Sequence, residues 1–141
     1  MLALALAAAV LLIIGELTRL SYRTIGQGAC DERINPDICT TTGADAHHYV
    51  LWVIAVALLA FAFGAAVGRS RPAAVAAMAC GVATLFIALV LDLPDLDDTR
   101  GIEALYNNAE GHIGTAFWLE LIGGALAVAA GALAFRIQPR R

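Results

Sequence analysis

Four long apolar runs dominate this chain and limit what it can fold into. They cover about residues 1–20, 49–68, 73–92 and 113–135 of a 141-residue sequence that is 60% hydrophobic. Each run is long enough to cross the hydrocarbon core of a bilayer as a helix. We therefore predict an all-α integral membrane protein, an antiparallel bundle of four transmembrane helices that forms one domain over residues 1–141. Such a domain leaves no room for a separate soluble enzyme.

The charged residues divide between the two ends of the predicted helices. The connection 69–72 and the C-terminal residues 136–141 together hold five arginines and no acid, whereas 23–48 and 92–112 hold ten of the twelve acids. Arginine-rich connections favour the cytoplasmic side of a membrane. This bias predicts a multi-pass protein of the cell (plasma or inner) membrane with both termini in the cytoplasm. A basic patch for nucleic acid is not expected at a net charge of −3.

The two acidic connections are then extracytoplasmic loops, 21–48 and 93–112. In the first, Cys30 and Cys39 are close in sequence on the oxidising side of the membrane, which predicts a disulfide. Three histidines, His47, His48 and His112, lie on the same side and raise the competing possibility of a metal site. Their spacing is not typical of zinc ligands, and the sequence predicts no metal.

Four spans with both ends inside and a close cysteine pair in the first outer loop are similar to the plan of claudin-like tetraspan membrane proteins. The resemblance rests on topology and on the spacing of Cys30 and Cys39. The loop contains no Trp, although the loop signature of that family does. No functional residue is carried over from the resemblance.

Two carboxylates lie within the apolar runs, and each invites a functional interpretation. Glu120 lies about 10 Å inside the fourth run at 1.5 Å per residue, and Glu16 lies at a similar depth in the first. Arg19 follows Glu16 by three residues and can pair with it, or reach Glu120 inside the bundle. Glu120 is thus expected to hold the fold by a pair within the chain, to meet a polar group of another subunit, or to line a proton or cation path.

Small residues continue from Glu120 along one face of the fourth run. Gly124, Ala127, Gly131 and Ala134 follow it at helical spacing, and such a stripe favours close packing of helix backbones. We expect the fourth helix to be the seam of the bundle.

The second outer loop contains an amphipathic segment. Ile102, Leu105 and Tyr106 recur at helical spacing, which predicts a short helix that lies on the outer membrane surface or docks against a partner.

No catalytic constellation is present. The chain lacks a Gly-x-Ser-x-Gly, a Walker sequence, a His-Glu-x-x-His and a Cys-x-x-Cys. We therefore expect no catalytic residues and no cofactor. The favoured hypothesis is a non-catalytic accessory or assembly subunit of a larger membrane complex, with an energy-transducing complex of the respiratory type as the example we consider. The alternative is a small homo-oligomeric channel or transporter with Glu120 facing the path, and an adhesive role for the outer loops is a third hypothesis.

Overall fold

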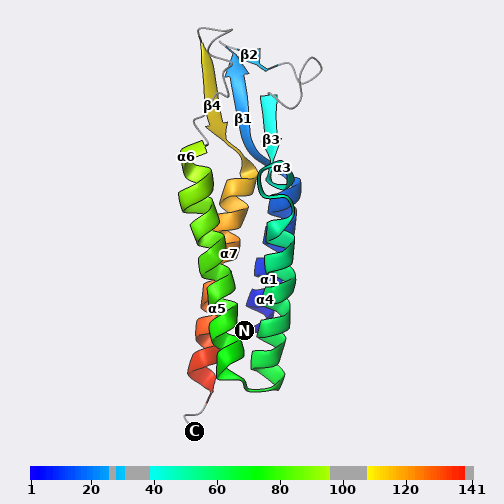
Figure 1. The fold of residues 1–141 in the computed structure, drawn as a ribbon, viewed down its shortest axis with the longest axis vertical. Helices are drawn as coiled ribbons and strands as arrows, with labels where there is room; N and C mark the ends of the chain where they lie inside the picture. The colour runs from blue at the N-terminus through cyan, green and yellow to red at the C-terminus, as the bar shows by residue number, and fades with distance from the viewer. Residues whose placement is uncertain (26–27, 31–38, 96–107, 139–141) are drawn as a thin grey trace.

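The computed structural model describes residues 1–25, 28–30, 39–95 and 108–138, and it places four apolar helices side by side below a small β-sheet (Figure 1). The elements are α1 (Leu2–Leu17), β1 (Arg19–Ile25), β2 (Gly28–Ala29), β3 (Thr40–Thr42), α3 (Gly43–His47), α4 (Val50–Val67), α5 (Arg71–Phe86), the π-helix η1 (Ile87–Asp92), α6 (Leu93–Asp95), β4 (Ala109–Ile113) and α7 (Thr115–Ile137).

Three of the helices are long and apolar enough to cross a membrane. They are α4, the continuous helix Arg71–Asp92 formed by α5 and η1, and α7. Helix α1 is apolar but has 16 residues, which is about 24 Å at 1.5 Å per residue. The predicted first span of residues 1–20 is therefore too long, because the chain becomes extended at Thr18 and enters β1 at Arg19.

The sheet is a feature that the all-α prediction missed. Strand β1 is its centre and pairs antiparallel with β4 from Ser21↔Ile113 to Ile25↔Ala109 on one side. On the other side β1 pairs with β3 and then with β2. The strands come from segments up to about 90 residues apart, and therefore no local pattern in the sequence predicts their pairing.

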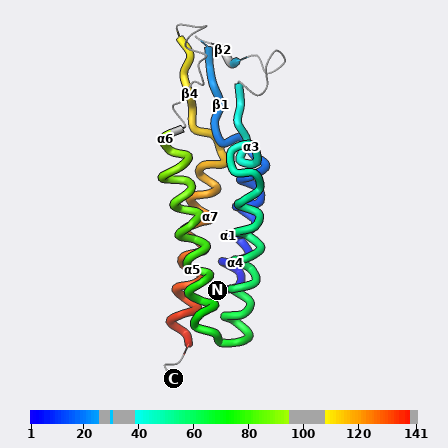
Figure 2. The backbone as a smooth tube through the Cα atoms, in the orientation of Figure 1, coloured from blue at the N-terminus to red at the C-terminus, as the bar shows by residue number. Residues whose placement is uncertain are grey.

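We call β1 to β4 with the disulfide the sheet lobe. The predicted disulfide between Cys30 and Cys39 is confirmed, with 5.4 Å between the two Cα atoms. Figure 2 shows the lobe continuing the line of the helices, at the end opposite to the α4–α5 connection. We refer to these two ends of the bundle as the lobe end and the turn end.

Helix α7 is the centre of the helix packing, because it lies against both α1 and α5 along its length. A Cβ placed on Gly131 would lie 2.7 Å from the backbone nitrogen of Met78, and one on Gly81 would lie 2.6 Å from that of Val128. These backbones therefore touch where glycine leaves room for them. The small stripe of α7 is used to join helices of the same chain.

At the turn end, polar contacts close the bundle. The Ser70 hydroxyl caps α5 by accepting a hydrogen bond from the Ala73 amide at 3.4 Å. The Arg71 guanidinium donates to the Gln138 carbonyl at 3.1 Å, and the Gln138 amide donates to the Ala65 carbonyl at 3.1 Å. These bonds fix the C-terminal end of α7 to the α4–α5 connection.

Candidate functional site

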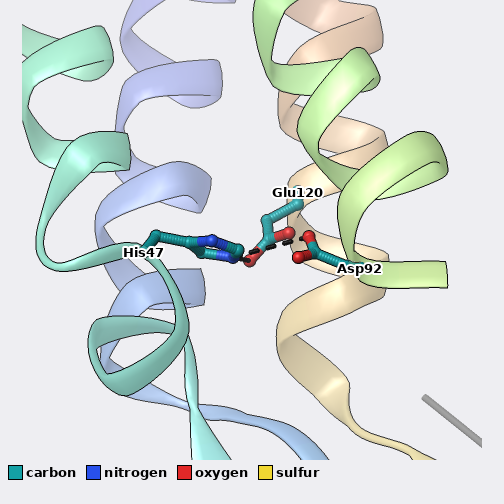
Figure 3. Close-up of side chains that lie close together, drawn as sticks. All are labelled: His47, Asp92 and Glu120. Atoms are coloured by element: carbon teal, nitrogen blue, oxygen red, sulfur yellow. Dashed lines mark ion pairs between the residues drawn. The ribbon is translucent and has the colours of Figure 1, made fainter. Parts of the chain in front are cut away.

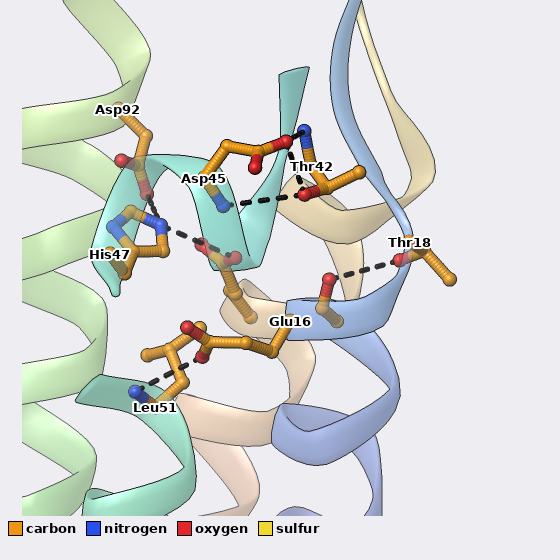
Figure 4. Close-up of polar contacts among 9 residues, drawn as sticks. Glu16, Thr18, Thr42, Asp45, His47, Leu51 and Asp92 are labelled. Carbon is orange, nitrogen blue, oxygen red and sulfur yellow. Dashed lines mark hydrogen bonds and ion pairs between the residues drawn. The ribbon is translucent and has the colours of Figure 1, made fainter. Parts of the chain in front are cut away.

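Four titratable side chains meet where the helices join the sheet lobe. They are Glu16 of α1, His47 of α3, Asp92 at the end of η1 and Glu120 of α7 (Figures 3 and 4). Glu16 and Glu120 are fully buried, Asp92 is 4% exposed, and the His47 side chain is 7% exposed. We call these four residues the polar layer. Buried ionisable groups in an otherwise apolar bundle are costly and therefore mark a candidate site.

The His47 imidazole lies between two carboxylates. Its Nε2 is 3.4 Å from Asp92 Oδ2 and 3.7 Å from Glu120 Oε1 (Figure 3). These separations are longer than the 2.7–2.9 Å that is typical of a charge-assisted hydrogen bond. Within the described part of the chain, His47 Nε2, Asp92 Oδ2 and both carboxylate oxygens of Glu120 are buried without a hydrogen-bond partner. The three side chains thus approach one another without saturating one another.

Glu16 borders this group from the α1 side. Its Oε2 accepts a hydrogen bond from the Leu51 amide of α4 at 3.1 Å (Figure 4). That amide belongs to the first turn of α4, which has no partner within its own helix. Glu16 therefore caps α4 from a neighbouring helix and adds a third buried carboxyl group to the layer.

Local structure turns His47 inward. The hydroxyl and backbone amide of Thr42 exchange hydrogen bonds with Asp45 in a capping box that begins α3. His48 and Tyr49 then have positive φ angles of 51° and 66°. Two consecutive non-glycine residues in this left-handed region are uncommon and strained, and such strain gathers at functional sites. The pair reverses the chain so that α4 starts beside α3 while His47 stays in the bundle.

Gly43 lets α3 approach α1 at the polar layer. A Cβ on Gly43 would lie 2.7 Å from the Cα of Glu16 and 3.0 Å from the Gly15 carbonyl oxygen. Any side chain at position 43 would therefore push α3, and with it His47, away from α1.

Asp92 and Glu120 come from the inward faces of their helices. Ala77, Thr84 and Ala88 are buried on the α5–η1 helix, and Asp92 continues the same face by one more turn. The segment that carries Asp92 is π-helical, a geometry that is frequent at functional sites. Glu120 faces α1, where a Cβ on Gly15 would lie 3.6 Å from its Cγ.

The electrostatics of His47 follow from its two neighbours. Burial alone lowers the pKa of an imidazole, but the carboxylates of Asp92 and Glu120 outweigh burial and raise the pKa of His47 to about 10. The arrangement therefore attracts positive charge strongly.

The structure brings together some of the residues that the sequence singled out and separates others. Glu16 and Glu120 both lie in the polar layer, at the lobe end of α1 and of α7. Arg19 is exposed at the start of β1, and the basic group beside Glu120 is His47.

The three histidines also have separate places. His112 lies on β4, where its ring stacks on Tyr22 and its Nε2 is 2.9 Å from the Thr24 hydroxyl. His48 is exposed, although it follows His47 directly.

Two of the remaining predicted residues lie in the helix packing, and three are not described by the structure. Gly124 and Gly131 pack against α5. The predicted docking residues Ile102, Leu105 and Tyr106 lie outside the described residues.

Sequence reasoning weighed His47 only with His48 and His112 as a competing metal site, and it did not place His47 or Asp92 beside Glu120. A signal for Asp92 was available, because the stripe of Ala77, Thr84 and Ala88 reaches Asp92 when it is extended by four residues. No equivalent signal existed for His47, whose position depends on the conformation of His48 and Tyr49.

Comparison of the chain with family models, with curated protein sequences and with solved structures found no match.

Proposed function

We propose that this protein is a non-catalytic subunit of a larger membrane protein complex and that it presents the sheet lobe to its partner. In this proposal all four apolar helices cross the cell membrane. Arg69, Arg71 and Arg136 support a cytoplasmic location for the turn end and both termini. The lobe end then lies outside the membrane, where the Cys30–Cys39 disulfide is chemically stable.

One observation carries the proposal: the polar layer draws on each segment that leads into or out of the lobe. Glu16 lies in the last turn of α1 just before β1, and His47 ends α3, which follows β3. Asp92 precedes the second connection, and Glu120 lies about two turns after β4. Contacts among the four therefore hold the lobe in a fixed position on the helices. A lobe of fixed orientation suits recognition of another protein, because its binding surface is formed before the partner arrives.

The sheet also has an edge at which a partner could pair. Among the described residues, β4 pairs with β1 on one side, which leaves its other edge with backbone groups to satisfy. Addition of a strand at such an edge is a common mode of protein recognition.

Co-purification tests the proposal. The tagged full-length chain is extracted in a mild detergent, and the proteins that migrate with it are identified by mass spectrometry. We expect one or more foreign membrane subunits at a constant ratio. A preparation that contains this chain alone, as a homo-oligomer, contradicts the proposal.

A matched pair of variants locates the binding surface. Leu105→Asp places a charge on the predicted apolar face and is expected to remove the partner. Asn107→Asp adds the same charge to the same loop without removing an apolar side chain and is expected to retain it. Equal loss in both variants would argue against docking through Leu105.

The alternative function is a channel or transporter, and the burial of Glu120 is the observation that favours it. Toward the turn end follow two apolar clusters of buried residues, first Ala9, Leu12, Leu51 and Ala55 and then Ala8, Leu58, Ala77 and Ala127. Within the described residues a path through one chain therefore stops below Glu120. Ion or solute flux into liposomes, compared between the wild type and Glu120→Gln, tests this function. It fails if the wild type carries nothing.

A further inference from the structure

We propose that His47, Asp92 and Glu120 form a binding site for one divalent first-row transition-metal ion, and that Zn²⁺ is the ion to which the donors are best suited. This site goes beyond the proposed docking function and does not depend on it. The candidate ligand atoms are His47 Nε2, Asp92 Oδ2 and Glu120 Oε1.

The positions of these atoms fit one small ion. Bonds of about 2.0–2.2 Å in a tetrahedral arrangement keep two ligand atoms about 3.4 Å apart. His47 Nε2 is 3.4 Å from Asp92 Oδ2 and 3.7 Å from Glu120 Oε1. Each of the three side chains offers one ligand atom such that the three atoms lie within 4.8 Å of one another.

The hydrogen-bonding state of these atoms is a second and independent observation. Each candidate ligand atom is buried without a hydrogen-bond partner among the described residues. Buried polar atoms normally have partners, and each exception requires an explanation. Figure 3 shows the three side chains, from three separate elements, pointing toward a common centre. A bound cation would satisfy all three atoms at once.

The donor set selects the class of ion. One imidazole nitrogen with two carboxylate oxygens suits Zn²⁺ and its first-row neighbours. Ca²⁺ prefers six to eight oxygen ligands, and sites for softer ions use thiolates, which this set does not contain. The two carboxylates balance the charge of a divalent ion when His47 binds as a neutral imidazole. A fourth position is then left for a water molecule.

Glu16 lies next to this site. Its Oε2 is held by the Leu51 amide, whereas its Oε1 is buried without a partner among the described residues. A carboxylate next to a metal centre orients the ligands and the bound water, and its loss typically weakens binding about 10–100-fold. Glu16 is therefore a neighbour of the site rather than one of its ligands.

Metal titration of the full-length chain tests the proposal. The protein is purified in detergent, stripped with a chelator, and titrated with ZnCl₂ by calorimetry. We expect one Zn²⁺ per chain. We also expect Glu120→Gln and Asp92→Asn each to lower the affinity at least about 100-fold, beyond the range of a bordering residue. The control Glu110→Gln changes an exposed carboxylate of β4 outside the layer and is expected to bind like the wild type.

A spectroscopic measurement on the wild type tests the proposal without relying on variants, which could fail to fold. Co²⁺ replaces Zn²⁺ in the wild type, and the visible absorption is recorded. Intense bands of a four-coordinate site with nitrogen and oxygen donors support the proposal, whereas the weak spectrum of hydrated Co²⁺ overturns it. It is equally overturned if the folded wild type takes up no Zn²⁺, or if folded ligand variants bind as tightly as the control.

Discussion

Replacement of Gly131 by alanine is a direct test of the packing of α7 against α5. The added Cβ would lie 2.6 Å from Met78 Cγ, 2.7 Å from the Met78 nitrogen and 2.9 Å from the Ala74 carbonyl oxygen. Because two of these atoms are backbone, the helices themselves must separate. Such overpacking costs about 1–3 kcal/mol, and the rigid backbone favours the upper end of that range.

Alanine also has a better helix propensity than glycine, by about 1 kcal/mol. The expected net loss for Gly131→Ala is therefore about 2 kcal/mol. Gly64→Ala is the matched control, because a Cβ there meets Ala73 Cβ at an ordinary 3.5 Å. This variant keeps the propensity gain and is expected to be stabilised by up to about 1 kcal/mol.

Reversible unfolding in mixed detergent micelles, followed by circular dichroism, measures both variants against the wild type. We expect the free energy of unfolding to fall in Gly131→Ala and to rise in Gly64→Ala, with a difference of about 3 kcal/mol between the two variants. Equal effects of the two substitutions would refute the close approach of α5 and α7 at Gly131.

Three further predictions concern the junction with the sheet lobe, and each is read by the same unfolding assay. Gly43→Ala pushes α3 away from Glu16 and is expected to cost about 1–3 kcal/mol; a neutral result would mean that the two helices are not in contact. Replacing both Cys30 and Cys39 by serine is expected to cost about 2–3 kcal/mol, because the short ring no longer restrains the unfolded chain; unchanged stability would contradict that expectation. Thr42→Ala removes the cap of α3 and is expected to cost about 1 kcal/mol, whereas Thr42→Ser keeps the hydroxyl and should be close to neutral.

The helices could be predicted from the sequence because each is an uninterrupted apolar run. The predicted spans 49–68, 73–92 and 113–135 lie within two residues of the helices at Val50–Val67, Arg71–Asp92 and Thr115–Ile137. The sheet could not be predicted, because β1 finds its main partner about 90 residues away. Pairing at that distance depends on the helices bringing the two connections together, and nothing in either segment encodes it alone.

Of the polar layer, too, one part could be predicted from the sequence and another could not. Glu120 could be predicted to face protein, because a carboxylate within an apolar helix avoids lipid. Its partner could not be predicted, since His47 enters the layer through a turn at His48 and Tyr49 that requires two uncommon backbone conformations. A pattern of apolar residues describes which face of a helix is buried, but it does not describe how a connection reverses.

A double-mutant cycle between His47 and Glu120 tests the polar layer most directly. The free energy of unfolding is measured for the wild type, His47→Gln, Glu120→Gln and the double variant, all as chelator-treated protein. Because the two side chains are buried 3.7 Å apart, we predict a coupling energy of about 1–3 kcal/mol. Effects that add within about 0.5 kcal/mol would mean that the two groups do not interact. That result would contradict the existence of the polar layer and, with it, the proposed anchoring of the lobe.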